Sequence, residues 1–185
     1  MTTIVCLAAI LAFAALPTFN NAMNSSQSAA IAGEEPSHQG LGVELSSNVT
    51  TLRLTESLAM RITITNKTRS LVYLDGRFAW GGGTNLAFAV QEAKTARVVP
   101  REIHYDTILP PARSRDVFIG LEPDQSTTVT MSETLADMGI KKPGVYKVSV
   151  FYRSPSGPDV AFDLPVWPSE RGWVRSNAIL IEVRK

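Results

Sequence analysis

The chain has 185 residues, of which 44% are hydrophobic and 19% are charged, with 18 basic and 17 acidic side chains. The formal net charge of +1 gives no electrostatic reason to expect nucleic acid or an acidic membrane surface as a partner. A single cysteine excludes a disulfide within the chain. We therefore expect one domain with a short N-terminal extension, held together by its core alone.

An apolar run of 13 residues, from Ile4 to Leu16, lies in a charge-free stretch that covers the first 33 residues. The run is too short for a bilayer core of about 30 Å, which needs about 20 residues, so we expect no stable membrane span. Small residues follow it, with candidate cleavage sites after Ala22, Ala30 and Ala32. This pattern predicts a secretory signal, although no basic residue precedes the run. The alternatives are an uncleaved anchor or a start codon assigned in the wrong place.

These features divide the chain into three parts. Residues 1–32 are predicted to hold the signal peptide and the start of a leader, and residues 33–40 the rest of that flexible leader. Residues 41–185 are predicted to form the folded domain, which is long enough to build a core without covalent links. The predicted location is extracytoplasmic, either periplasmic or secreted.

Alternation of apolar and polar residues predicts short β-strands throughout the domain, separated by turn residues. The alternation is clearest from Ser57 to Thr65, where four apolar side chains share one face. The expected strands are Leu41–Leu45, Val49–Leu54, Ser57–Thr65, Leu71–Leu74, Leu86–Val90, Asp116–Leu121, Ser126–Met131, Val145–Tyr152 and Asn177–Val183. With about eight or nine antiparallel strands and almost no helix, the fold class is all-β, a sandwich rather than βαβ units.

The stretch from Lys142 to Tyr152 is the expected central strand. Pro143 and Gly144 fit the two central positions of a tight turn, in which the glycine would accept a positive φ. A run of β-branched and aromatic residues follows at once. Leu58, Ile62, Tyr146, Val150 and Ile181 are expected to lie in the core between the two layers.

The run Gly144-Val145-Tyr146-Lys147-Val148 resembles the tyrosine corner of immunoglobulin-like domains. The resemblance implies that the Tyr146 hydroxyl bonds to backbone a few residues upstream, with a helical turn at 135–138 in the preceding link. Val148 stands where antibody domains carry a cysteine, so the likeness is to fibronectin-type or bacterial modules. It covers Leu41 to Lys185 and implies a fold, which by itself implies no function.

Three segments also resemble the loops of chagasin-type cysteine-peptidase inhibitors, which are immunoglobulin-like. They are Asn66-Lys67-Thr68 for the B–C loop, Gly81-Gly82-Gly83 for a glycine loop, and Tyr152-Arg153-Ser154-Pro155 for the F–G loop. If Leu71–Leu74 is strand C, the glycines are expected at the opposite end of the domain from the other two loops.

Signals for catalysis and metal binding are weak. Glu102, His104 and Asp106 would share one face of a strand and could hold a cation, but a solvated edge strand is the expectation. A Ser–His–Asp arrangement stays open because its members can come from anywhere in the sequence. Without a nucleophile elbow or a mature cysteine, we expect no enzyme, no metal and no cofactor.

The connection 153–175 is the most informative candidate for a working surface. Loops longer than about 12–15 residues in a compact domain are usually functional or disordered, and this one contains four prolines. Exposed tryptophans on loops are favoured anchors for partners. For Trp173 we expect instead that the ring closes the open end beside the last strand, whereas both roles stay open for Trp167 and Trp80. The candidate contact residues are Trp167, Arg171, Trp173, Arg153, Asn66 and Trp80.

The leading hypothesis is an exported, non-catalytic module that binds a protein or glycan through connection 153–175, assisted by the B–C turn 66–70. The first alternative is a chagasin-like peptidase inhibitor. The second is a structural or accessory domain of an envelope assembly. The ligand and the oligomeric state do not follow from the sequence.

Overall fold

The computed structural model describes residues 40–81, 84–100, 109–155, 162–167 and 172–185. The predicted signal and most of the leader lie outside these residues, as do Glu102, His104, Asp106 and Arg171. The described part is all-β, as predicted, and its one helical element is a short 3-10 turn at Arg115–Val117. No helix in this part of the chain is long and apolar enough to cross a membrane.

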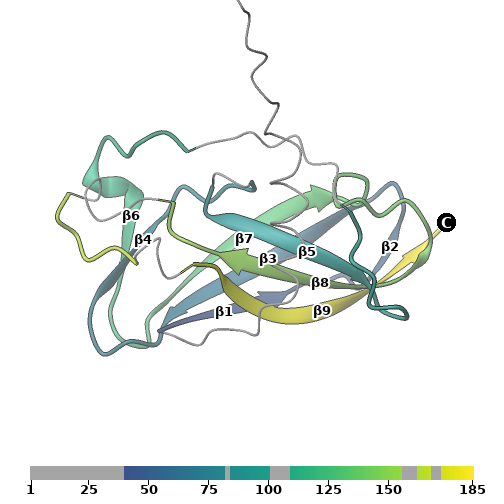
Figure 1. Ribbon diagram of the computed structural model, residues 1–185, viewed down its shortest axis with the longest axis horizontal. Coiled ribbons are helices and arrows are strands. Elements are labelled where there is room, and N and C mark those ends of the chain that lie inside the picture. Colours follow the sequence, from purple (N-terminus) through teal and green to yellow (C-terminus); the bar gives the residue numbers. More distant parts are fainter. Residues whose placement is uncertain (1–39, 82–83, 101–108, 156–161, 168–171) are drawn as a thin grey trace, which may run out of the picture.

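Nine strands form three sheets (Figure 1). The first sheet has the order β1-β3-β7, the second β2-β9-β8-β5, and a small third sheet pairs β4 with β6. The strands are β1 (Leu41–Ser46), β2 (Thr51–Arg53), β3 (Ser57–Asn66), β4 (Val72–Asp75), β5 (Leu86–Glu92), β6 (Phe118–Leu121), β7 (Ser126–Thr134), β8 (Gly144–Tyr152) and β9 (Val174–Arg184).

One hydrophobic core joins the two larger sheets. The apolar face predicted for β3 is fully buried, because Leu58, Met60, Ile62 and Ile64 are each 0% exposed. From the second sheet, Val148 and Val150 of β8 and Ile181 of β9 join the same core. Burying a side chain of this size contributes about 1.5–3 kcal/mol to the free energy of folding. The apolar faces of β3 and β8 therefore hold the two larger sheets together.

Two expectations about strand pairing are wrong. The strands were expected to be antiparallel, but β2 pairs with β9 in parallel, with Leu52 beside Val183. Leu71–Leu74 was considered as strand C of an immunoglobulin-like sheet, but β4 pairs with β6 in a separate small sheet, and the strands beside β8 are β5 and β9. The second error follows from the length of β4, since four residues carry too little pattern to show which strand lies beside it.

Tyr146 and Gly144 lie at the start of β8. The Tyr146 hydroxyl donates a hydrogen bond of 2.9 Å to the carbonyl of Lys142, four residues upstream. Gly144 does not have the positive φ expected for a turn position; it is the first residue of β8 and pairs with Val183. A Cβ at this position would lie 3.4 Å from the Tyr146 ring, so the ring packs across the glycine.

Candidate functional site

We use the term loop end for the end of the molecule where β8 finishes and β5 and β9 begin, at the left of Figure 1. The register places Tyr152 of β8 beside Leu86 of β5 and Val174 of β9. The start of the connection 153–175 therefore lies next to the segment before β5. Two contacts join them, because the Arg153 amide donates to the Asn85 carbonyl at 3.0 Å and Arg153 Nε to the Thr84 carbonyl at 3.4 Å.

Arg153 and Trp173 face each other across the two ends of that connection. The Arg153 guanidinium carbon lies 4.6 Å from the centre of the Trp173 ring, a cation–π distance that contributes about 0.5–2 kcal/mol. Both side chains are partly exposed. Burial lowers the pKa of Arg153 from its usual value, which places the cation in a partly desolvated setting. We call these two residues the Arg153–Trp173 pair.

A second cation–aromatic contact lies on β8 and β9, next to the residues that flank these strands in the first contact. The Arg175 guanidinium carbon is 5.7 Å from the centre of the Phe151 ring, and its Nη2 donates to Ser149 Oγ at 3.4 Å. Phe151 is only 1% exposed although it lies on the outer face of β8. Two contacts between a guanidinium and an aromatic ring therefore lie at the loop end. Of the two rings, Phe151 is buried and Trp173 is partly exposed.

Trp167 is in the core rather than on the surface. Its side chain is 2% exposed, and its ring lies close enough to Gly40 that a Cβ there would come within 3.1 Å. Its backbone amide donates to the Tyr73 carbonyl at 2.8 Å, and the Tyr73 amide donates to the Pro165 carbonyl at 3.0 Å. This part of the long connection thus runs along β4 and is anchored there by Trp167.

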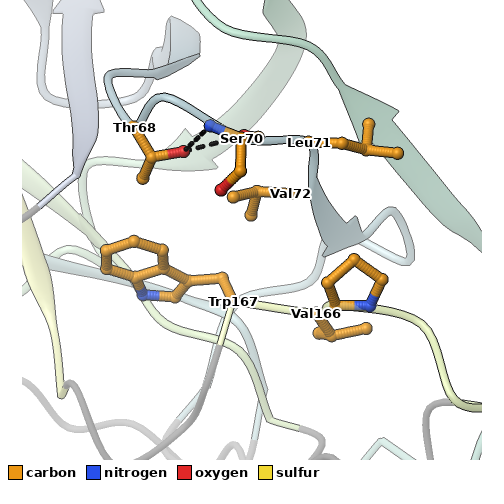
Figure 2. A pocket seen from close by; sticks show the side chains of 7 residues that line it. Thr68, Ser70, Leu71, Val72, Val166 and Trp167 are labelled. Carbon is orange, nitrogen blue, oxygen red and sulfur yellow. Dashed lines mark hydrogen bonds between the residues drawn. The ribbon is translucent and has the colours of Figure 1, made fainter.

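A pocket of about 180 Å³ lies between this anchored segment and the B–C turn (Figure 2). The Trp167 ring forms one wall, and Thr68 and Ser70 lie across from it. Thr68 Oγ1 lies 2.8 Å from the Ser70 carbonyl and accepts from the Ser70 amide at 3.3 Å, so the turn is tight on this side of the pocket. The lining residues are Thr68, Ser70, Leu71, Val72, Pro165, Val166 and Trp167.

Asn66 organises the B–C turn from inside and is 0% exposed. Its Nδ2 donates to the carbonyls of Ser70 and Leu121, each at 2.8 Å. Its Oδ1 accepts from the amide and the hydroxyl of Thr68 at 2.8 and 2.7 Å. Because the whole amide is engaged with its own chain, Asn66 fixes the turn and does not reach the surface.

Trp80 is likewise a core residue, at 7% exposed. Its ring meets Phe88 edge to face, with centroids 5.1 Å apart and planes at 88°. Among the predicted contact residues that the structure describes, only Arg153 and Trp173 are partly exposed and adjacent. Trp167, Trp80 and Asn66 are buried.

The sequence analysis missed a buried ion pair that locks the loop end. Asp75 is 0% exposed, and its carboxylate accepts from Arg77 Nε at 3.0 Å and Nη2 at 2.6 Å. Arg77 Nη1 donates to the Pro110 carbonyl at 2.7 Å. Asn85 Nδ2 donates to the Asp75 carbonyl at 2.9 Å, which ties β4 to the segment before β5. Asp-Gly-Arg directly after a short apolar run is the one sequence signal that could have suggested this lock.

The pKa values of Arg77 itself and of nearby Tyr152 are both raised. The hydrogen bond with Asp75 raises the pKa of Arg77. Burial, and then the Asp75 carboxylate, raise the pKa of Tyr152 well above its usual value. Within the described ranges, no group of three His, Cys, Asp or Glu side chains could hold a metal ion. The groups described at the loop end are a cation, an aromatic ring and backbone groups.

No family model and no curated protein matches the chain. Solved structures that resemble it include a β-glucosidase from Listeria innocua, with 19% identity and a TM-score of 0.38, over 78% of this chain and 16% of the enzyme chain. A CARDB domain from Pyrococcus furiosus matches over 78% of this chain and 87% of its own, with 10% identity and a TM-score of 0.36. An alkylpurine DNA glycosylase from Pseudomonas fluorescens matches over 79% and 31%, with 13% identity and a TM-score of 0.40. The chain spans about a sixth of the β-glucosidase, and at these TM-scores none of the likenesses decides a fold or a function.

Proposed function

We propose that this chain is an exported, non-catalytic, immunoglobulin-like β-sandwich module that binds a protein or glycan partner at the loop end. Two sheets around one core and the bond from Tyr146 to Lys142 support the fold. The apolar run from Ile4 to Leu16 supports export. The buried Asp75 and Asn85 bond to groups of their own chain, which suits a rigid scaffold.

The observation that carries the binding site is the Arg153–Trp173 pair. The ring and the guanidinium lie 4.6 Å apart, so each limits the conformational freedom of the other before a partner arrives. A partner then loses less free energy to ordering these side chains. Tryptophan and arginine are also the residues most enriched among those that dominate binding energy at interfaces. Of the contact residues in the sequence-based hypothesis, this proposal keeps Arg153 and Trp173. It drops Trp167, Trp80 and Asn66, which are buried.

The test begins with capture of a partner from the native host by the wild-type chain, followed by affinity measurements with variants. Arg153→Ala and Trp173→Ala are each expected to weaken binding at least about tenfold, the equivalent of about 1.4 kcal/mol. Leu180→Ala is the matched control, because Leu180 is 55% exposed on β9, outside the loop end. Thermal unfolding of each variant separates lost binding from lost folding. Unchanged affinity in the double variant would exclude this site.

A chagasin-like cysteine-peptidase inhibitor is the second candidate, and one observation favours it. Gly81, the described member of the glycine run, donates to the Leu86 carbonyl, and Leu86 pairs with Tyr152 at the start of the 153–175 connection. The opposite end was expected if Leu71–Leu74 is strand C. The B–C turn and Trp167 line the same pocket. This candidate predicts low-micromolar or tighter inhibition of a papain-like peptidase, and absence of inhibition across several such enzymes would remove it.

A structural or accessory role in an envelope assembly remains the third proposal. It predicts that the chain co-purifies with a complex and has no ligand of its own. The affinity experiment separates it from the first, because a purely structural domain would show no partner that depends on Arg153 and Trp173.

A further inference from the structure

Strand β7 forms one edge of the β1-β3-β7 sheet. Its register with β3 is unbroken, from Ser57 beside Thr134 to Thr65 beside Ser126. Among the described residues, the backbone bond at its outer side is the one at its end, where Met138 N donates to the Thr134 carbonyl at 3.0 Å. An edge of nine residues with this regularity is a template for pairing with another strand.

The groups that β7 offers at this edge follow from the bonds at its two ends. Asn66 N donates to Gln125 O, and Leu135 N donates to Glu56 O. In an antiparallel ladder, alternate residues point their backbone groups toward the same neighbour. The odd-numbered residues of β7 therefore bond to β3, and the even-numbered ones point their N–H and C=O groups outward. These are Ser126, Thr128, Thr130, Ser132 and Thr134, of which the Thr134 carbonyl is already bonded to Met138 N.

Apart from one inward-pointing charge, Glu133, the strand lacks the sequence features that usually block such pairing. The strand has no proline and no lysine or arginine, and its ladder with β3 contains no bulge. Its only charged residue is Glu133, which is 7% exposed. The outer face is the solvent-exposed surface of the sheet, as distinct from its edge. On this face hydroxyls link β7 to β3, with Thr63 to Thr128 at 3.1 Å and Thr65 to Ser126 at 2.8 Å.

We propose that β7 pairs antiparallel with β7 of a second copy of this chain, about a twofold axis at Thr130. The sequence of the strand is self-complementary in that register. On the outer face Thr128 of one copy lies opposite Ser132 of the other. On the inner face the partly buried Val129 lies opposite Met131, so both gain apolar contact. The two β1-β3-β7 sheets become one continuous six-stranded sheet.

Electrostatics do not oppose this register. The charged side chain on the outer face nearest the axis is Arg61, which lies beside Thr130 in the ladder. The two copies of Arg61 are separated by three strand spacings, about 14 Å, which exceeds the screening length of about 8 Å in physiological salt. Because a single strand pair buries less surface than a standard interface, we expect a dimer that dissociates on dilution rather than a permanent one.

The test is sedimentation of the full chain over a range of concentrations, where the mass is expected to double between dilute and concentrated samples. Thr130→Pro is the informative variant, because its N–H points outward and is not used in the ladder with β3. It is expected to abolish the dimer while thermal unfolding is retained. Thr130→Val is the matched control, since it keeps the N–H and the branched shape, and it is expected to dimerise like the wild type.

If Thr130→Pro does not fold, Thr128→Lys with Ser132→Lys places like charges opposite each other across the axis and should also give a monomer. Hydrogen exchange identifies the partner, because the outward amides of Thr128, Thr130 and Ser132 should become protected only as concentration rises. A monomer at every concentration overturns the proposal. So does protection that is already complete in dilute samples, since another segment of the same chain would then close the edge.

Discussion

Removing the Arg77 guanidinium is the perturbation whose size follows most directly from the structure. Arg77→Met keeps an aliphatic stem but deletes the donors at 3.0 and 2.6 Å from the Asp75 carboxylate. Only the Arg77 backbone amide, at 3.0 Å, then remains among these bonds. Asp75 is 0% exposed, so its charge stays buried after the change.

Breaking a buried ion pair by removing one partner costs about 3–5 kcal/mol. The Arg77 side chain is 23% exposed, so solvent screens part of the interaction and we expect the lower end, about 3 kcal/mol. The hydrogen bond with Asp75 raises the pKa of Arg77. The contribution of the ion pair to the free energy of unfolding is therefore fully present below the usual arginine pKa, and it is lost only in strong alkali. The full loss is therefore expected at neutral pH.

The assay is urea unfolding followed by tryptophan fluorescence, with the free energy of unfolding taken by linear extrapolation. Arg113→Met, at an exposed position, is the control and should change the free energy by less than about 0.5 kcal/mol. A loss below about 1 kcal/mol in Arg77→Met, the size expected of an exposed pair, would refute the reasoning.

Three further changes test the core and the corner by the same unfolding assay. Ile62→Ala, at a fully buried position, should cost about 2–5 kcal/mol, and a near-neutral result would mean that the sheets do not pack there. Tyr146→Phe deletes the 2.9 Å bond to the Lys142 carbonyl and should cost about 0.5–1.5 kcal/mol; no change would make the bond irrelevant to stability. Trp80→Phe should cost less than about 1.5 kcal/mol, because the indole N–H has no acceptor among the described residues and the contact with Phe88 can persist. A larger loss would point to a bond that the indole makes.

The periodic stretches predicted the core well. The alternation in Ser57–Thr65 identified the four buried side chains of β3, and the β-branched run after Pro143 identified β8. Both are long enough for one face to be chosen by hydrophobicity alone. The parallel contact of β2 with β9 and the pairing of β4 with β6 were missed, because short strands take their neighbours from tertiary packing.

The candidate site was predicted only in part. The Arg153–Trp173 pair lies in the connection that the sequence singled out, but Trp167 and Trp80 are buried, and the sequence left both roles open for them. A tryptophan in a proline-rich loop has the same local sequence whether it faces solvent or fills the core. The Asp75–Arg77 lock had only the local signal Asp-Gly-Arg, because its third contact, Pro110, is distant in sequence.

Site-specific photocrosslinking in the native host tests the central claim, that the partner contacts the Arg153–Trp173 pair. A benzophenone amino acid is placed at Trp173 in one variant and at the exposed Leu180 in the other. We predict a discrete crosslinked product from position 173 and none from position 180. Crosslinking at 180 alone, or none at 173 in a correctly folded and exported variant, would contradict the account.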